Sequence, residues 1–361
     1  MLQIDYSLDK LEDYKEDWDE ASHQSKIPIQ TFNWFRCCEK AFLDKSILVI
    51  SVHESPNKNR LIASIPLSIY RKVLGYPSYT ILGGTILHEP SDFIYQDNNA
   101  LEKLIKGMTS LKCPLILQRI PYDFNLSFFI KKSSRYKYFY SERETTSSQY
   151  INLTDNIEEF ETKLSSKRKY DIKRARNKAE ACGILKTEFI KPNNNNINEI
   201  LDLAFDIEHN SWKGDNSSSI LSRPALNKFF RCYLKNACYK EKLLVAFLKI
   251  DEIAVAMQIA IIENNSLWLL KIGHRNSFQH ISPGILLTHE LIKHAIKKRL
   301  DKFEFLGSTE SWIRLWGPNE HRYKLCIYYP LNLSGITHLL ADQIARLIRK
   351  LKKLASDFYH V

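Results

Sequence analysis

The sequence lacks several patterns that would by themselves assign a protein to a class. No stretch approaches about 18 uninterrupted apolar residues, so no membrane-spanning helix is expected. The first residues, Met1 to Tyr6, show no basic region followed by an apolar run, so no signal peptide is expected. The seven cysteines form no Cys-x-x-Cys pair, and we expect them to be reduced, mostly buried thiols of a cytoplasmic protein.

Signals for covalent catalysis and for nucleic-acid stacking are also missing. The chain has no Gly-x-Ser-x-Gly turn, and its cysteines and histidines show no pairing that would indicate an activated thiol. Its most basic segment, residues 163–178, lacks the interleaved aromatic residues on which single-stranded bases stack. We therefore expect neither a covalent acyl-enzyme nor sequence-specific binding of nucleic acid.

The composition is that of a folded protein of about two domains. The chain has 361 residues, of which 44% are hydrophobic and 12% aromatic, enough to bury sizeable cores. The formal charge of +11 favours an anionic partner, such as a phosphorylated cofactor, a nucleic acid or an acidic membrane.

The first half alternates predicted strands and helices, which is typical of an α/β or α+β layer structure. Its predicted elements are a hairpin of strands 46–53 and 61–71, a strand at 79–87, a helix at 99–109 and a strand at 114–119. The polar stretch 131–149 carries no motif and ends at a strand-like segment, residues 150–153. We place the domain boundary there, giving an N-terminal domain of residues 1–150.

The second half has a distinctive order of elements. Helical patterns precede three consecutive antiparallel strands, which are followed by a helix and a further strand. The predicted helices are 154–182, 197–212, 225–238 and 284–300, and the predicted strands are 184–190, 243–250, 253–263, 266–272 and 303–306. This is the order of the acetyl-CoA-binding half of an acetyltransferase-like (GNAT) domain.

Five segments, in the right order, resemble the CelD-like (BioF2-like) acetyltransferases, a GNAT family related to the Fem-type peptidyltransferases. The resemblance runs from about Thr31 to Tyr329. Its segments are QHISPGILL at 279–287 with FEFLG at 303–307, LSSKRKYD at 164–171, EHNSWKG at 208–214, and IPL at 65–67 with PSDF at 90–93.

The resemblance implies tandem GNAT-like domains, each a mixed, mainly antiparallel sheet flanked by helices. The second domain, residues 151–335, would bind acyl-CoA as co-substrate without a metal. The residue pattern itself predicts that residues 336–361 form a C-terminal amphipathic basic helix. The implied activity is transfer of an acyl group to an amino group of a small molecule, a sugar or a polysaccharide precursor.

The segment at 279–287 also has a physical interpretation of its own. A helix N-terminus exposes unpaired N–H groups and a partial positive charge, which together bind phosphate. Gln279, Ser282 and Gly284 fit the spacing of an acetyltransferase pyrophosphate loop, with Ser282 where glycine is usual. The candidate cofactor-binding residues are Gln279, Ser282, Pro283, Gly284, Ile285 and Leu286. The structural alternative is a helix capped by Ser282 with Pro283 at its first position.

Residues 163–178 hold eight lysines or arginines against a single acid, Asp171. The simpler interpretation is a solvated helix face. The functional one is a surface for an anionic acceptor, for the 3′-phosphate of coenzyme A or for RNA.

Direct attack of an amine on a thioester needs a proton acceptor and hydrogen-bond donors for the developing oxyanion. The candidate catalytic residues are Glu304, which matches a family aspartate, Glu208 and Lys271, with His274 or His280 as weaker candidates. The candidate substrate-binding residues are Asp92, Trp212, Lys213 and Arg314. The alternative for Trp212 is a core position, with Glu208 and Lys213 in solvent.

Two further segments bear on the function, one after the 303–307 strand and one at residues 336–358. The family commonly has a Tyr-Lys pair after the 303–307 strand, whereas this chain has Trp312 and Ile313, with Arg314 next to them. The segment 336–358 predicts an amphipathic helix with a basic second face. That helix either packs on its own domain or makes a peripheral contact with the inner face of a membrane.

Three functional classes follow from the sequence. The first is an acyl-CoA-dependent N-acyltransferase. The second is a Fem-type transferase that uses aminoacyl-tRNA, although the helical arm usual in that group is not evident. The third is a catalytically degenerate binding module, which the loss of the Tyr-Lys pair makes credible.

Overall fold

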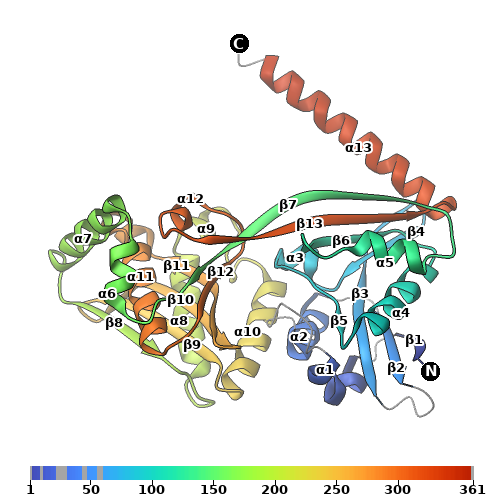
Figure 1. The fold of residues 1–361 in the computed structure, drawn as a ribbon. Coiled ribbons are helices and arrows are strands. Elements are labelled where there is room, and N and C mark those ends of the chain that lie inside the picture. Colours follow the sequence, from blue (N-terminus) through green and yellow to red (C-terminus); the bar gives the residue numbers. More distant parts are fainter. Residues whose placement is uncertain (1, 9–10, 22–30, 43–46, 55–59, 359–361) are drawn as a thin grey trace. The chain divides into compact units, whose positions relative to one another are not determined.

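The structure is a computed structural model that describes residues 2–8, 11–21, 31–42, 47–54 and 60–358 (Figure 1). The chain forms two compact units. The first comprises residues 1–36, 43–145 and 323–361, and the second comprises 37–42 and 146–322. The boundaries predicted from the sequence stay predictions. The units are made of non-consecutive ranges because two long strands, β7 (Tyr138–Asn152) and β13 (Asn319–Pro330), run from one unit into the other.

The first unit contains a mainly antiparallel sheet with the strand order β1-β2-β3-β4-β6-β13, in which only the β4–β6 pair is parallel among the described strands. Its other strands are β1 (Leu2–Leu8), β2 (Leu48–Glu54), β3 (Leu61–Val73), β4 (Tyr76–Ile81), β5 (Ile94–Tyr95) and β6 (Leu115–Pro121). Its helices are α1 (Lys15–Ala21), α3 (Gly84–Leu87), α4 (Asn98–Ser110), α5 (Leu126–Ser133) and α13 (Leu333–Phe358), and α2 (Phe32–Phe42) begins there.

The second unit contains a sheet with the order β7-β12-β11-β10-β9-β8, antiparallel except for the parallel β11–β12 pair. Its strands are β8 (Leu185–Ile190), β9 (Leu243–Ile250), β10 (Ile253–Glu263), β11 (Ser266–His274) and β12 (Lys302–Leu306). Its helices are α6 (Ile157–Lys163), α7 (Ser166–Glu180), α8 (Ile197–His209), α9 (Trp212–Asp215), α10 (Pro224–Tyr239), α11 (Pro283–Lys297) and α12 (Ser311–Arg314).

Helices cover both faces of the second sheet. On β9, alternate residues from Leu244 to Ile250 join a core cluster with α6, α7 and α11, while Leu243, Val245 and Phe247 are buried on the other side. Because successive strand side chains point to opposite faces, α8 and α10 cover that second face. The sheet is therefore buried on both sides, which explains the nearly continuous apolar runs of β9 and β10.

Most elements predicted for the second half are confirmed, and local signals explain them. Asn264 and Asn265 both adopt positive φ, 48° and 53°, in the tight turn between β10 and β11. Asparagine tolerates this conformation better than most residues, and a two-residue hairpin turn of type I′ requires it at both central positions. The Ser165 hydroxyl accepts a hydrogen bond from the Arg168 N–H and caps α7, so the predicted helix 154–182 is split into α6 and α7.

Two predictions for the first half are wrong. The predicted strand 79–87 ends at Ile81 and is followed by the short helix α3. The polar stretch 131–149, for which the sequence predicts no element, contains the end of α5 and most of β7. Among the described residues, no helix is both long enough and apolar enough to cross a bilayer.

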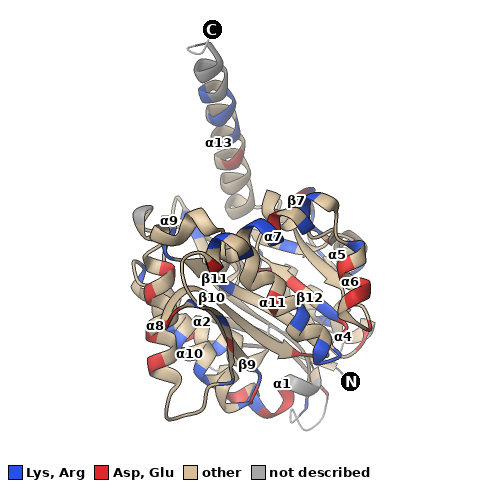
Figure 2. Ribbon diagram, turned by 90° about the vertical axis from the view of Figure 1, so that its left-hand side faces the viewer, with Lys and Arg blue, Asp and Glu red and all other residues tan. Residues whose placement is uncertain are grey.

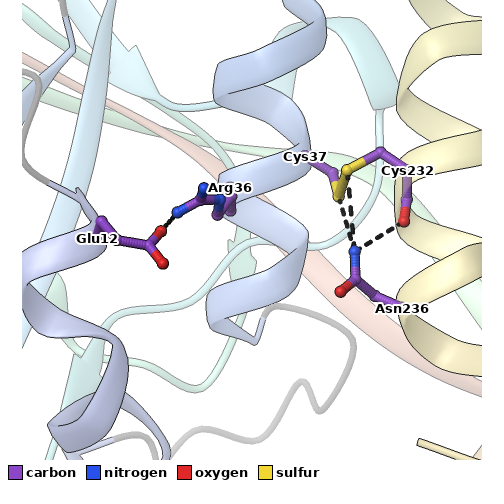
Figure 3. The surroundings of a disulfide bond; sticks show 5 residues. All are labelled: Glu12, Arg36, Cys37, Cys232 and Asn236. Atoms are coloured by element: carbon purple, nitrogen blue, oxygen red, sulfur yellow. Dashed lines mark hydrogen bonds and ion pairs between the residues drawn. A yellow bond between two sulfur atoms is a disulfide. The ribbon is translucent and has the colours of Figure 1, made fainter. Parts of the chain in front are cut away.

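The prediction that all seven cysteines are reduced is also wrong. Cys37 on α2 and Cys232 on α10 form a disulfide with 5.7 Å between their Cα atoms, a separation typical of disulfides. The Asn236 amide lies against both sulfurs (Figure 3). The partners are 195 residues apart, so no local spacing pattern could have indicated the pair. Cys38, Cys113, Cys182, Cys238 and Cys326 are free thiols.

We expect Cys232→Ser to lower the free energy of unfolding by about 2–4 kcal/mol under oxidising conditions, because the disulfide closes a long loop in the unfolded chain. Urea denaturation with and without reductant measures the effect. Cys182→Ser, which removes an exposed free thiol, is the control and should change little. A wild-type protein whose stability is unaffected by reductant would contradict the prediction.

Candidate functional site

The central strands of the second unit separate where the candidate site lies. β11 pairs with β12 only from Ser266 to Trp268, opposite Lys302 to Glu304. Beyond that point β11 continues to His274, whereas β12 ends at Leu306. A β-bulge at Leu270 shifts the register of β11 against β10 in the same segment. The separated edge of β11 thus offers backbone groups that are not used by a β12 partner.

A cavity of about 410 Å³ lies beside this separated edge. It is lined by residues of β10, β11, α9, the start of α11 and the loop after β12. These are Ser211, Trp212, Lys213, Met257, Gln258, Ile272, Gly273, His274, Gln279, Ser282, Pro283, Gly284, Ile285, Leu287, Thr288, Glu310 and Trp312. Five of the six predicted cofactor-binding residues line it, together with Trp212 and Lys213. The sixth, Leu286, is 1% exposed and packs in the core.

The N-terminus of α11 opens into this cavity. Ser282 is the N-cap residue and Pro283 occupies the first helical position, as the structural alternative predicted, but the Ser282 hydroxyl makes no capping hydrogen bond. A Cβ added to Gly284 would meet nothing within 4 Å. The first N–H groups of a helix have no carbonyl partner within it, and the helix dipole adds partial positive charge. This end therefore suits an anionic group such as phosphate.

Ser282 has a left-handed backbone, with φ 54° and ψ 53°. This explains why glycine is usual at its position, because a Cβ there costs roughly 1–2 kcal/mol.

We expect Ser282→Gly to raise the free energy of unfolding by about 0.5–1 kcal/mol, because relief of this strain exceeds the extra entropy of glycine in the unfolded chain. Thermal and urea unfolding measure it. Ser282→Val, which adds a β-branch in the left-handed region, should destabilise the protein. A destabilised Ser282→Gly variant would show that the hydroxyl contributes more than the strain costs.

Gln258 and Thr288 connect the sheet to the start of α11. The Gln258 Nε2 donates to the Thr288 hydroxyl at 2.7 Å, and that hydroxyl donates to the Gly284 carbonyl at 2.8 Å. The Gln258 Oε1 is buried without a protein partner within the described residues. An orphaned acceptor on the wall of a cavity fits a ligand N–H. Sequence reasoning missed Gln258, although a lone polar residue within the apolar run of β10 was an available signal.

Lys213 and Glu208 form a buried ion pair at the cavity wall. The Lys213 Nζ donates to the Ile272 carbonyl at 2.7 Å and lies 3.4 Å from the Glu208 Oε1. The other oxygen of Glu208 accepts from the Ile220 N–H at 2.7 Å. Burial lowers the pKa of Lys213, and the Glu208 carboxylate partly opposes that shift. The arrangement fixes the Lys213 ammonium against the separated part of β11.

The alternative predicted for this segment is wrong in each part. Trp212 is 55% exposed rather than in the core, while Glu208 is 2% exposed rather than in solvent. Glu310 and Trp312, which sequence reasoning did not select as binding residues, also line the cavity, and the Trp312 indole donates to the Glu310 carboxylate at 2.6 Å. Trp312, at the position of the tyrosine in the family pair, is thus part of the cavity wall in this chain.

The remaining predicted catalytic residues lie outside the residues that line the cavity. Glu304 is buried, and both of its carboxylate oxygens lie 3.1–3.2 Å from the His321 Nε2. His321 stacks on Tyr150 with 4.2 Å between ring centroids. The Lys271 Nζ lies 4.7 Å from the ring centroid of Phe230 on α10. Neither Glu304 nor Lys271 lines the cavity.

Two predicted substrate-binding residues do not line the cavity either. Asp92 is buried in the first unit, where its carboxylate accepts from the Phe93 N–H at 2.8 Å. Arg314 is exposed at the end of α12. Of the two histidines considered, His274 lines the cavity and burial lowers its pKa, whereas His280 is exposed beside Lys178.

The basic segment 163–178 is divided between surface and interior. Arg168 is fully buried, and its guanidinium donates to the carbonyls of Trp312 at 2.8 Å and Leu315 at 3.3 Å. Lys163 and Arg176 pair with glutamates. Lys167, Lys169, Lys173 and Arg174 are exposed, so part of the solvated or anion-binding surface that we considered is present.

A larger depression of about 910 Å³ lies between α6, α7, β8 and α11. It contains none of the predicted catalytic, cofactor-binding or substrate-binding residues. His289 lines it, stacked between Phe160 and Trp316. Its volume exceeds that of the first cavity, but it has neither a helix N-terminus nor a separated strand edge, so we place the candidate site at the smaller cavity.

Burial lowers the pKa of His274, His289 and His294. The unfolded chain therefore binds more protons than the folded one as the pH falls below about 6.5, the ordinary histidine pKa. We expect the free energy of unfolding to decrease as the pH falls through that value. Urea denaturation between pH 7.5 and 5 measures the slope, which His289→Phe should reduce. Parallel curves for wild type and variant would exclude a contribution of His289.

Residues 166–324 match the family model of the acetyltransferase (GNAT) domain. The chain carries a GNAT domain. The matched range contains the separated strands, the cavity and the start of α11, and the predicted membership of the GNAT superfamily is confirmed. No curated protein matches the sequence.

Solved structures share the whole fold at low sequence identity. The C-terminal domain of a putative lysylphosphatidylglycerol synthetase from Agrobacterium fabrum has a TM-score of 0.57 and 12% identity, over 93% of this chain and 96% of that one. FemX has a TM-score of 0.58 and 11% identity, over 94% and 99%. A tandem GNAT protein from the clavulanic acid biosynthesis pathway has a TM-score of 0.50 and 8% identity, over 91% and 99%. The predicted tandem GNAT-like fold, mixed and mainly antiparallel, is confirmed.

Proposed function

We propose that the protein is an N-acyltransferase that uses acyl-CoA and transfers the acyl group to an amine of a small molecule, a sugar or a polysaccharide precursor. One observation carries the proposal: the start of α11, with open space at Gly284, faces a cavity beside the separated edge of β11. The first N–H groups of α11 would hold the pyrophosphate, and the orphaned Gln258 Oε1 would accept a hydrogen bond from an amide of the pantetheine arm. When bound, the thioester supplies the activated acyl group.

The chain's own residues would carry out the remaining tasks. Backbone N–H groups of β11 beyond Leu270 would stabilise the oxyanion that forms when the amine attacks. The Glu304–His321 pair is a candidate proton acceptor, because the buried carboxylate orients an imidazole that is about one-third exposed. Lys271 and the Glu208–Lys213 pair would position the acceptor and the edge of β11.

Thermal unfolding with acetyl-CoA, longer acyl-CoAs and free coenzyme A tests the cofactor. A ligand that binds the folded state raises the melting temperature in a dose-dependent way. Gly284→Ala should keep that shift, because the added methyl group meets nothing, whereas Gly284→Trp should abolish it by filling the cavity. No shift with any of these ligands in the wild type would reject the coenzyme A assignment.

A Fem-type transferase that uses aminoacyl-tRNA is the second candidate. It is supported by the exposed cations of α7, which suit a polyanion. Binding of tRNA that weakens steeply with salt, without a coenzyme A shift, would favour it. If the protein showed neither tRNA binding nor a coenzyme A shift, the results would favour a catalytically degenerate binding module.

A further inference from the structure

The C-terminal helix α13 turns its polar side toward its own unit. Asp342 accepts hydrogen bonds from Arg71 on β3 and from the Tyr329 hydroxyl on β13, each at 2.5 Å. One turn earlier, His338 is fully buried. Leu339 packs against the small cluster of Ile116, Ile327 and Tyr329. The side of α13 that faces the sheet is thus fixed by an ion pair and by a short contact near the start of the helix.

The apolar side of α13 points away from that contact. Residues that recur every three or four positions form a stripe along it, and their side chains are 43–69% exposed. We call this set the apolar stripe: Leu333, Ile336, Leu340, Ile344, Leu347 and Leu351. An amphipathic helix of a globular domain normally buries such a stripe against its core. Here the orientation is reversed, and a large apolar surface is presented outward.

The same helix is strongly basic. Between residues 343 and 356 the sequence contains Arg346, Arg349, Lys350, Lys352 and Lys353 and no acid. At 100° per residue, Lys350 and Lys352 flank the apolar stripe on its two sides. Figure 2 shows the basic residues along α13 in blue. A groove of about 490 Å³ between α13 and its sheet adds Arg71 and Arg143 to the arginines of the helix.

We propose that α13 binds the surface of a membrane rich in anionic lipids. The apolar stripe would enter the boundary between headgroups and acyl chains, and the flanking cations would meet the lipid phosphates. Both features are those of interfacial amphipathic helices, whose binding combines apolar burial with attraction to anionic headgroups. Asp342 and its partners would hold the helix so that its apolar stripe faces the lipid. The inference concerns where the protein acts and stands apart from the proposed catalytic activity.

A second copy of the chain is the competing occupant of the apolar stripe. Two such helices side by side would bring their basic segments together without acids to compensate them, because residues 343–356 contain none. The like charges favour an anionic surface over self-association.

Co-sedimentation of the full-length protein with vesicles tests the proposal. We expect binding to vesicles of phosphatidylglycerol and phosphatidylcholine, weak binding to phosphatidylcholine alone, and a marked loss at high salt. Lys350→Ala with Lys352→Ala should weaken the partition coefficient about 25-fold, at about fivefold per cation. Leu347→Asp with Leu351→Asp should weaken it by at least about 100-fold.

Two matched control variants distinguish binding by α13 from nonspecific binding through any exposed apolar residue or any exposed cation. Ile184→Asp replaces an exposed apolar side chain, and Lys167→Ala removes an exposed cation, both in the second unit. Neither should change vesicle binding. Equal binding by the α13 variants and the wild type would overturn the proposal. So would a stable dimer in light scattering that Leu347→Asp dissociates while vesicles bind nothing.

Discussion

Replacing Arg168 with leucine is expected to lower the free energy of unfolding by about 2–5 kcal/mol, because two hydrogen bonds from a buried charged group are lost. The Arg168 guanidinium is fully buried, donates to two carbonyls of the turn around α12 and lies 4.4 Å from the ring centroid of Trp316. Leucine would leave both carbonyls without their charged donor, and each unsatisfied group costs about 1–3 kcal/mol.

The same change should weaken ligand binding at the cavity. The turn that Arg168 holds carries Trp312, whose side chain lines the cavity and contacts Glu310. A loosened turn would no longer keep this wall in place, so we expect the coenzyme A-dependent rise in melting temperature to shrink as well as the melting temperature itself.

Arg174→Leu is the matched control, because Arg174 is an exposed arginine on the same helix. It should change stability by no more than about 0.5 kcal/mol. Urea denaturation and ligand titration of both variants measure the difference. Similar losses for the two arginines would mean that the basic character of α7, rather than the contacts of Arg168, matters.

The burial of Arg168 could not be predicted from the sequence. In the sequence it is one of eight cations in a charged run, and nothing local distinguishes it from Lys167 or Lys169. Its burial depends on carbonyls almost 150 residues later in the chain. Such contacts between distant parts of the chain follow from the tertiary fold, and the periodicity of a single sequence does not predict them.

Where the sheet is buried on both faces, the sequence predicts its elements well. β9, β10 and β11 are apolar runs separated by short polar turns at Asp251 and Asn264, which is the pattern of consecutive antiparallel strands. β7 was missed for the opposite reason. Its sequence, YFYSERETTSSQYIN, is polar over most of its length and is half-buried or exposed until Ser148. Its strand conformation depends on partners such as β12, and a polar strand carries no periodic signal.

In the candidate site, too, local sequence signals predicted some residues, whereas residues that depend on distant contacts were missed. Five residues predicted from one contiguous motif, Gln279 and 282–285, line the cavity, and the start of a helix after a loop is a local signal in the sequence. Gln258, Thr288 and His321 were missed, because their roles depend on distant partners. Glu208 was selected from a motif, yet its burial and its bond to the Ile220 N–H came only from the structure.

Glu208→Gln is expected to destabilise the protein by about 3 kcal/mol, because it removes the counter-charge of a buried ammonium. Burial already lowers the pKa of Lys213, and the Glu208 carboxylate opposes that effect. Without the carboxylate the pKa should fall further, so Lys213 would lose its charge more readily and hold the Ile272 carbonyl less strongly.

A double-mutant cycle with Lys213→Met tests this coupling. Methionine has a similar length and no charge, so Lys213→Met alone leaves the Glu208 carboxylate short of one partner and should also be destabilising. In the double variant no uncompensated charge remains, and we expect it to be more stable than the sum of the single effects by about 1–3 kcal/mol. Urea denaturation of the four proteins measures this energy. Additive effects would show that the two residues act independently, and would remove the reason to treat them as one unit at the edge of β11.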